Sequence, residues 1–382
     1  IVVQKYILRE MIRISGKVIQ NAYDETTDVF NLLDEAESEL FKVTEGNIRK
    51  DYESMASLLF KAQSEIEIAM QKEDGINGVG SGFKELDKIT SGWQKSDMIV
   101  IAARPGMGKT AFVLSMARNV AVDYEHPVAI FSLEMSSIQL VNRLISGEAE
   151  IPAEDIRRGN FSKSEFEQFF ERTKSLSEAP IYIDDTPALS IFELRAKSRR
   201  LKQQHNVQLI IIDYLQLMSS GGKGGNREQE ISNISRSIKE IAKELEIPII
   251  ALSQLSRSVE TRGGDKRPML SDLRDSGAIE QDADIVGFIY RPEYYQLTEW
   301  PDGSPCNNQG EIIIAKHRNG SLKDVRLKFI GKYAKFSDLD GLSQNDFMYN
   351  AGMKPNNDFG DDVSSFTMPS KMNDDSSNED PF

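Results

Sequence analysis

The chain has 382 residues, of which 28% are charged and 39% hydrophobic, and its formal net charge at pH 7 is −14. This length suits one large α/β domain with additional segments, and no apolar run approaches the roughly 20 residues that a membrane-spanning helix requires. A single cysteine, Cys306, excludes an internal disulfide and, with only three histidines, argues against a structural zinc site. We therefore expect a cytoplasmic protein without membrane association.

Helical patterns occupy the first 77 residues. Residues 1–28 contain an apolar helical stretch, and 29–77 form a predicted helical linker region with a further helix over 47–72. Apolar side chains spaced i, i+3, i+4, i+7 and i+11 line one face of a predicted helix over 29–42: Val29, Leu32, Leu33, Ala36 and Leu40. This stripe could pack on its own domain or on a neighbouring subunit, and periodicity alone does not choose between them.

Beyond a glycine-rich segment over 75–82, which is typical of a linker, short apolar runs alternate with helical stretches. This alternation favours an α/β domain over 78–340, with a central, mainly parallel sheet flanked by helices. The predicted strands are 98–103, 128–132, 180–183, 208–213, 248–253 and 284–290. The predicted helices are 109–121, 136–147, 163–177, 190–204 and 227–245.

The predicted domain ends with a hairpin, and an acidic tail follows. Residues 311–316 and 324–330 read as two strands joined by a tight turn at Asn319-Gly320. The final segment, 341–382, is rich in Asn, Asp and Ser, so we expect it to be disordered.

The stretch Met98–Thr110 has the pattern of a phosphate-binding loop: an apolar run, a glycine turn, then a predicted helix, with Ala103 in place of the usual first glycine. Backbone N–H groups near Gly106 and Gly108 and the helix N-terminus suit phosphate oxygens. Lys109 can reach the β- and γ-phosphates, and the Thr110 hydroxyl can bind Mg²⁺. The predicted nucleotide-binding segment comprises Ala103, Arg104, Pro105, Gly106, Met107, Gly108, Lys109, Thr110 and Ala111.

Polar side chains end or follow three other predicted strands. Asp213 ends an apolar run and should lie beside the loop, where it can hold Mg²⁺ through water. Glu134 follows the strand 128–132, which we expect to lie next to the strand of the phosphate-binding loop. Its carboxylate would then activate a water for attack on the γ-phosphate, although a helix-capping acid is the alternative. Gln254, at the end of another strand, could sense the γ-phosphate.

Two cations, Lys316 and Arg318, fall at the expected tip of the hairpin. A basic turn is usually solvated surface. The functional alternative is an arginine finger that enters the nucleotide site of an adjacent subunit and stabilises charge at the γ-phosphate. That role requires a ring or a filament.

Two predicted loops combine glycine with basic side chains. One covers residues 219–227, and the other covers 259–277 and contains Arg262, Lys266, Arg267 and Arg274. Backbone N–H groups and cations suit a sugar-phosphate backbone, and because neither loop has an aromatic residue, base stacking is not the expected mode. Ordinary surface loops are the alternative.

Together these motifs resemble bacterial replicative DNA helicases of the DnaB type, a hexameric family with a RecA-like P-loop NTPase motor. The resemblance covers about residues 1–340. Its segments are 82–87 (GFKELD), 102–110 (AARPGMGKT), 132–135 (SLEM), 212–218 (IDYLQLM), 252–255 (LSQL), 271–284 (SDLRDSGAIEQDAD) and 316–320 (KHRNG).

The resemblance implies a homohexameric ring around single-stranded DNA that hydrolyses ATP with Mg²⁺ between subunits, moves 5′ to 3′ and unwinds duplex DNA at the replication fork. Primase, a helicase loader and other fork proteins are the implied partners. For the ATP site it implies the following roles: Lys109 and Thr110 bind phosphate and Mg²⁺, Glu134 is the catalytic base, Asp213 belongs to the Mg²⁺ site, Gln254 is the sensor, Arg143 approaches the phosphates, and Lys316 and Arg318 act in trans.

The resemblance also assigns the DNA contacts and the linker. The residues matched to DNA-proximal segments are Arg227, Glu228, Arg274, Asp275 and Gly277, although family members often have Glu where Asp275 stands. The helix over 29–42 matches a linker helix that docks on the next subunit. Residues 1–28 would be only the last piece of the family's N-terminal helical domain, which binds primase and forms a collar.

Two other functions are compatible with a phosphate-binding loop. A RecA-like recombinase filament would share the loop, but should lack the SLEM and KHRNG segments in this arrangement. A non-translocating ATP-binding scaffold is the second, and intact Lys109, Glu134, Asp213 and Arg318 argue against it. The last residues, 378–382 (NEDPF), are similar to the acidic tip of single-stranded DNA-binding proteins, which recruits partners.

Overall fold

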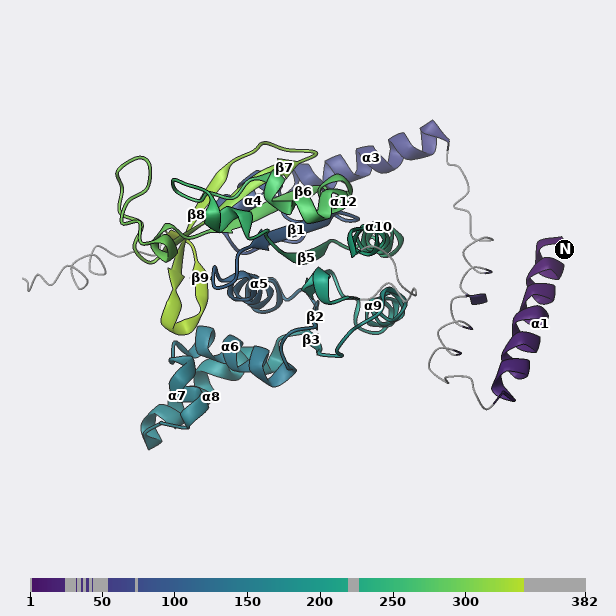
Figure 1. Ribbon diagram of the computed structural model, residues 1–382, viewed down its shortest axis with the longest axis horizontal. Coiled ribbons are helices and arrows are strands. Elements are labelled where there is room, and N and C mark those ends of the chain that lie inside the picture. The colour runs from purple at the N-terminus through teal and green to yellow at the C-terminus, as the bar shows by residue number, and fades with distance from the viewer. Residues whose placement is uncertain are drawn as a thin grey trace, which may run out of the picture. The chain divides into compact units, whose positions relative to one another are not determined.

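The computed structural model describes residues 2–24, 54–72, 75–218 and 227–339, together with five separate positions between residues 31 and 44. Four predicted features lie wholly or partly outside the described residues: most of the helix over 29–42, the first part (47–53) of the helix over 47–72, the loop over 219–226, and the tail over 341–382. Figure 1 labels the described helices and strands on a ribbon diagram.

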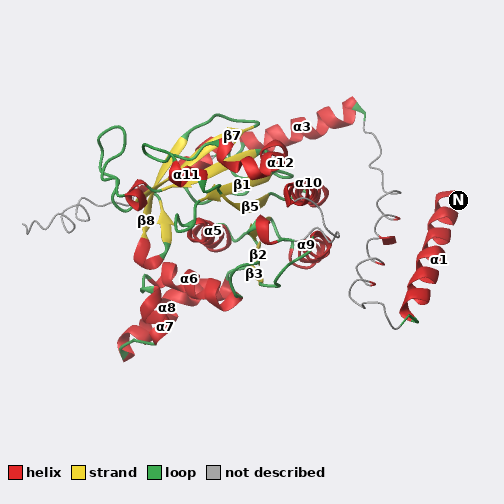
Figure 2. Ribbon diagram, viewed as in Figure 1, coloured by secondary structure: helices red, strands yellow, loops and turns green. Residues whose placement is uncertain are grey.

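The described residues build a nine-stranded sheet in the order β3-β2-β4-β5-β1-β6-β7-β8-β9 (Figure 2). The first six strands in this order run parallel, and the last three are added antiparallel. The strands are β1 (Met98–Ala103), β2 (Val128–Ser132), β3 (Ile181–Asp184), β4 (Leu209–Asp213), β5 (Ile249–Gln254), β6 (Ile285–Tyr290), β7 (Gln309–His317), β8 (Asp324–Ile330) and β9 (Lys335–Ser337). The predicted fold class is confirmed.

Helices cover both faces of this sheet (Figure 2). The described helices of the chain are α1 (Val2–Ala22), α3 (Met55–Met70), α4 (Lys84–Thr90), α5 (Lys109–Arg118), α6 (Ser137–Ala149), α7 (Ala153–Arg158), α8 (Lys163–Glu178), α9 (Ile191–His205), α10 (Arg227–Leu245), α11 (Ser258–Thr261) and α12 (Gly277–Asp282). No helix within the described ranges is both long and apolar enough to cross a membrane.

The core has two halves, one on each face, because successive side chains of a strand point to opposite sides. Ile99 and Ile101 of β1 pack with α4, α5 and α6, whereas Met98 and Val100 pack with α9, α10 and α12. All six residues of β1 are buried. Burial on both faces explains why this strand is continuously apolar rather than alternating.

The long strands and helices that the sequence predicts between residues 98 and 330 are largely confirmed. The six predicted parallel strands agree with β1 to β6 within one residue, and the start of α5, the whole of α10 and the antiparallel pairing of β7 with β8 are as expected. The expected tight turn at Asn319-Gly320 is wrong, because residues 318–323 form a longer connection. The predicted helix over 109–121 stops at Arg118 and continues as a π-helical turn, Asn119–Asp123, closed by a bond from the Tyr124 N–H to the Asn119 carbonyl.

The glycine-rich segment 75–82 is an ordered edge of the domain, which corrects its interpretation as a linker. Val79 and Trp93 exchange both backbone hydrogen bonds, at 2.9 and 2.7 Å. A Cβ at Gly78 would lie 2.3 Å from the Trp93 carbonyl oxygen, so glycine allows this close approach. The buried Asp87 carboxylate then accepts the N–H groups of Ser81 and Gly82, at 2.7 and 3.1 Å.

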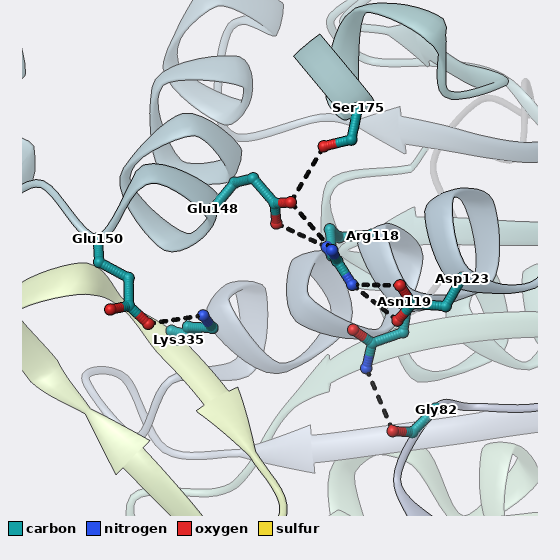
Figure 3. Close-up of polar contacts among 8 residues, drawn as sticks. All are labelled: Gly82, Arg118, Asn119, Asp123, Glu148, Glu150, Ser175 and Lys335. Atoms are coloured by element: carbon teal, nitrogen blue, oxygen red, sulfur yellow. Dashed lines mark hydrogen bonds and ion pairs between the residues drawn. The ribbon is translucent and has the colours of Figure 1, made fainter. Parts of the chain in front are cut away.

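A charged network fastens α6 and α8 to the end of α5 (Figure 3). The Arg118 guanidinium donates to both carboxylate oxygens of Glu148, at 2.6 and 2.9 Å, and to Asp123 at 2.7 Å. Ser175 of α8 donates to the same Glu148 carboxylate at 3.1 Å. This network positions α6, the helix that follows Glu134 and carries Arg143.

Candidate active site

The phosphate-binding loop joins the end of β1 to the start of α5, as the sequence pattern predicts. Gly106 and Gly108 have φ angles of 81° and 96°, in the left-handed region that favours glycine. Added Cβ atoms would come within 3.0 Å of the Tyr294 ring at Gly106 and 3.1 Å of the Phe336 ring at Gly108. The loop therefore needs glycine for its shape and its packing, and leaves the N-terminus of α5 available to an anion.

Lys109, the first residue of α5, lies between two neighbouring strands. Its ammonium donates to the Ser253 carbonyl at 3.2 Å and lies 5.1 Å from the centre of the Tyr214 ring. Burial lowers the pKa of Lys109, while the negative charges of Asp213 and Glu134 oppose that shift. A bound polyphosphate would favour the charged form of this ammonium in the same way.

Thr110 and Asp213 meet directly. The Thr110 hydroxyl donates to the Asp213 carboxylate at 2.9 Å, and Asp213 is 2% exposed. Burial raises the pKa of Asp213, against the effects of the Thr110 hydroxyl and of Lys109.

These two side chains fit a Mg²⁺ site. A divalent cation stabilises a buried carboxylate, and hydroxyl and carboxylate oxygens are the ligands that Mg²⁺ prefers. No group of three or more His, Cys, Asp or Glu side chains in the described part of the chain could hold a metal. With a nucleotide bound, phosphate oxygens and water would complete the ligands of the ion.

Glu134 reaches the site from a different strand position than expected. The expectation that β2 lies next to β1 is wrong, because β4 and β5 separate them. Ser132 of β2 pairs with Asp213 of β4, and the Leu133 N–H donates to the Asp213 carbonyl at 2.7 Å. Glu134 is exposed just beyond this point, and its charge opposes the lowering of the pKa of Lys109. The charge of Glu134 therefore still acts on Lys109 of the phosphate-binding loop.

Gln254 and Arg143 approach the same region from β5 and α6. Gln254 pairs in register with Ala103, so it stands where the phosphate-binding loop begins. The charge of Arg143 lowers the pKa of Asp213, against the dominant effect of burial. Arg143 also lines a small hollow with Ser115 and Lys335.

Arg104 and Met107, although part of the nucleotide-binding segment, are buried in the domain with exposed fractions of 6% and 2%. The Arg104 guanidinium donates to the Leu255 carbonyl at 2.8 Å and to Glu260 at 3.0 Å. These contacts hold the loop against the end of β5.

Lys316 and Arg318 lie at the opposite end of the strands, where the parallel strands of the sheet begin. Lys316 pairs with Val286 near the start of β6, within β7 rather than at a hairpin tip, which corrects its expected position. The Arg318 guanidinium donates to the Gln281 carbonyl at 2.7 Å and lies 3.6 Å from the Asp284 carboxylate. Because the phosphate-binding loop is at the carboxyl end of β1, these cations do not share an edge with it.

The predicted DNA-contacting residues divide into three groups. Arg227 and Glu228 begin α10, and the Arg227 guanidinium donates to the Gln216 carbonyl and contacts Glu230. Arg274 and Asp275 lie in a 3₁₀ segment, Leu270–Ser276, but their side chains are outside what the structure describes. Gly277 is the first residue of α12, and the space at its Cβ position is open.

Two cations of the loop over 259–277 are engaged within the domain. Arg262 donates to the Asp272 carboxylate and to the Arg267 carbonyl. Arg267 pairs with Glu311 at 2.5 Å and with Asp324 at 2.6 Å. Both therefore brace the loop, which the charge pattern alone did not reveal.

Sequence reasoning also missed four residues beside the site. Tyr214 lies under Lys109, and the Ser253 carbonyl accepts its bond. Arg291 donates to the Gly106 carbonyl at 3.3 Å, and the Tyr294 ring contacts the same glycine. Tyr214 follows Asp213 in the sequence, and Ser253 precedes Gln254. Their position beside predicted site residues could therefore have identified them. Arg291 and Tyr294 lie after β6, where no periodic pattern marks them.

Comparisons with known proteins agree with this geometry. Residues 78–338 match the family model described as the DnaB-like helicase C-terminal domain. The chain is 47% identical to the replicative DNA helicase DnaB of Geobacillus stearothermophilus over 341 residues, covering 89% of this chain and 74% of that protein. It is 46% identical to the replicative DNA helicase DnaC of Bacillus subtilis (strain 168), with the same coverage.

Two solved structures are similar as well. One, described as an ATPase domain, has a TM-score of 0.70 and 41% identity, and covers 76% of this chain and all of that one. The other, described as a DnaB-like replicative helicase and its interactions with primase, has a TM-score of 0.67 and 38% identity, and covers 88% of this chain and 78% of that one. The chain belongs to the DnaB-like family of replicative DNA helicases.

Proposed function

We propose that this chain is one subunit of a homohexameric ring that hydrolyses ATP, moves 5′ to 3′ on single-stranded DNA and unwinds duplex DNA at the replication fork in the cytoplasm. The observation that carries the proposal is the contact between Thr110 and Asp213, with Lys109 beside it, at a glycine loop that opens α5. In this proposal the motor domain extends over 78–340, preceded by a helical region over 1–28 and a linker over 29–77 and followed by the acidic tail over 341–382.

Each side chain of the site has one task in this proposal. Lys109 holds the β- and γ-phosphates, while Thr110 and Asp213 hold Mg²⁺, which neutralises charge on the phosphates when bound. The Glu134 carboxylate accepts a proton from water as the water oxygen bonds to the γ-phosphorus and the bond to the β-phosphate oxygen breaks. Gln254 senses the γ-phosphate, and Arg143 adds positive charge nearby.

The opposite placement of the phosphate-binding loop and Arg318 supports a site shared between subunits. Lys316 and Arg318 contact carbonyls at the end of α12, at the sheet edge far from the loop. An arginine there serves a nucleotide held by a neighbouring copy. Arg227, Glu228, Arg274, Asp275 and Gly277 contact the DNA backbone, and primase and a loader bind the assembled ring.

The first experiment measures mass by light scattering, with and without ATP and Mg²⁺, beside unwinding of a fork with a 5′ single-stranded tail. We expect a hexamer that unwinds.

Lys109→Ala and Glu134→Gln should each lower DNA-stimulated ATP hydrolysis by about 100-fold or more, because they remove phosphate binding and the base. Glu167→Gln, at an exposed position of α8, is the matched control and should behave as wild type. Near-normal turnover of Lys109→Ala or Glu134→Gln would refute the site assignment.

A further inference from the structure

A run of three hydrogen bonds connects the nucleotide lysine to the start of α10. The Lys109 ammonium donates to the carbonyl of Ser253 at 3.2 Å, and the hydroxyl of the same Ser253 accepts the Gln216 side-chain amide at 2.8 Å. The carbonyl of Gln216 in turn accepts the Arg227 guanidinium. Gln216 therefore stands between a phosphate-binding residue and a proposed DNA-contacting residue.

The position of Gln216 allows it to join two strands and a helix. It lies in a 3₁₀ turn, Leu215–Leu217, just beyond Asp213 at the end of β4. From there its side-chain oxygen also faces the Gln254 N–H, at 3.4 Å, so that one amide contacts two successive residues of β5. Ser253 is completely buried, which strengthens the bond that its hydroxyl accepts.

A cleft of about 510 Å³ opens at this point. Its lining includes Gln216, Arg227, Gln254 and Arg257. Space beside the Arg227 guanidinium lets an incoming phosphodiester compete with the Gln216 carbonyl for its N–H groups. At the other end, nucleotide phosphates compete with the Ser253 carbonyl for the three N–H donors of Lys109.

We propose that Gln216 is a positioning residue that couples the nucleotide site to the DNA-contacting start of α10, an inference that rests on the function proposed above. When Lys109 turns to the phosphates, the end of β5 is released from one of its bonds. Gln216 transmits that change because its side chain holds β5 and its carbonyl holds Arg227. The coupling works in both directions, since linked binding equilibria are reciprocal.

Gln216→Met tests the coupling. Methionine has a similar length, cannot donate to Ser253 or accept from Gln254, and leaves the backbone carbonyl for Arg227. We expect ATP hydrolysis without DNA, and its KM for ATP, to stay within about twofold of wild type. Stimulation by a single-stranded oligothymidine should fall about tenfold, a change that corresponds to about 1.4 kcal/mol. A merely structural role would lower both rates together.

Ser253→Ala removes the same bond from its other end and keeps the carbonyl that Lys109 uses. It should lower the stimulation in the same direction, and the double variant should lose no more than Gln216→Met alone, because Gln216→Met already lacks the bond to Ser253. This second variant also tests the proposal if Gln216→Met does not fold. Gln203→Met, at an exposed position of α9, is the matched control.

The outcomes are distinguishable. Wild-type stimulation in both Gln216→Met and Ser253→Ala would overturn the coupling while leaving the proposed function intact. Equal loss of the basal and the stimulated rates would overturn it as well. A wild-type chain that hydrolyses ATP with no response to DNA would overturn the proposed function, and the coupling with it.

Discussion

Burial of charge sets the properties of single residues in this protein. Asp213 is buried and Lys109 is half-buried, and the loss of hydration raises the pKa of Asp213 and lowers the pKa of Lys109, while the charge of each opposes the shift of the other. Bound nucleotide and Mg²⁺ would add opposite charge to both. Binding of the nucleotide and Mg²⁺ would therefore stabilise the charged forms of Lys109 and Asp213, which the loss of hydration disfavours.

Burial also shifts the pKa of Asp97, which lies outside the site. Its pKa is raised from 3.8 to about 6, first by burial and then by the charge of Asp284, while Lys239 and Arg318 oppose the shift. The folded chain thus binds this proton more tightly than the unfolded chain. The free energy of unfolding should consequently fall as the pH rises from about 4 to about 6, and stay lower above that range.

We expect Asp97→Asn to be more stable than wild type at pH 8, by roughly 1–3 kcal/mol, and nearly equal to it at about pH 3.5, where Asp97 is protonated in most of the unfolded chains as well. Chemical unfolding at both values measures this difference. Asp302→Asn is a control of opposite sign. Bonds from Ser304 and the Arg326 charge lower the pKa of Asp302 to about 2, so its contribution is present at neutral pH and is lost as the pH falls below 4. An Asp97→Asn variant whose stability relative to wild type is the same at about pH 3.5 and at pH 8 would contradict the raised pKa.

Sequence predicted the residues whose roles depend on local pattern. A buried strand, a glycine turn and a helix define the surroundings of Lys109 and Thr110, so their position followed from neighbours along the chain. The bonds of Arg104, Arg262 and Arg267 within the domain did not follow, because their partners are not marked by any pattern along the chain. A charge pattern cannot tell a cation that is free for a ligand from one that is paired internally.

At the scale of elements, long periodic segments were predictable and their spatial order was not. β2 and β1 are both continuous apolar strands, and nothing in either indicates that β4 and β5 lie between them. The charge of Glu134 nevertheless acts on Lys109, because β2 and β4 end side by side. Short elements such as α7, α11 and β9 were missed, since a period needs more residues than they contain.

The segment over 78–82 offers a test at this scale. Gly78→Ala would place a Cβ 2.3 Å from the Trp93 carbonyl oxygen, so the backbone bonds between Val79 and Trp93 must shift or break. We expect a loss of roughly 1–3 kcal/mol in the free energy of unfolding, measured by thermal or chemical unfolding. Gly263→Ala, where the added Cβ meets nothing within 4 Å, is the control. A free linker would tolerate both substitutions equally.

For the whole molecule, the decisive feature is that the phosphate-binding loop lies at the carboxyl ends of the parallel strands and Arg318 at their amino ends. Arg318→Ala should keep nucleotide binding but lose most turnover, by about 1,000-fold if it acts as an arginine finger. Nucleotide binding and ATP hydrolysis, measured separately, distinguish these effects.

Mixing the variants tests whether Arg318 acts on a neighbour. Arg318→Ala retains its own loop, and Lys109→Ala retains its own arginine. In a random one-to-one mixture, about a quarter of the interfaces would combine an intact loop with an intact arginine, because each interface takes one half from each subunit. ATP hydrolysis should return in the mixture. A mixture as inactive as its components would mean that Arg318 does not act across an interface.

Because the phosphate-binding loop and Arg318 lie far apart within one chain, ATP hydrolysis would depend on how the chains assemble. A chain that carries half of a site at each of two edges completes as many sites as there are closed contacts. In a linear assembly that does not close into a ring, the subunit at one end has a phosphate-binding loop that no neighbouring Arg318 reaches. The subunit at the other end has an Arg318 that reaches no phosphate-binding loop. If Arg318 acts in trans as proposed, ATP hydrolysis per chain reports how many contacts between subunits are closed, and dilution that separates the subunits should abolish ATP hydrolysis before any subunit unfolds.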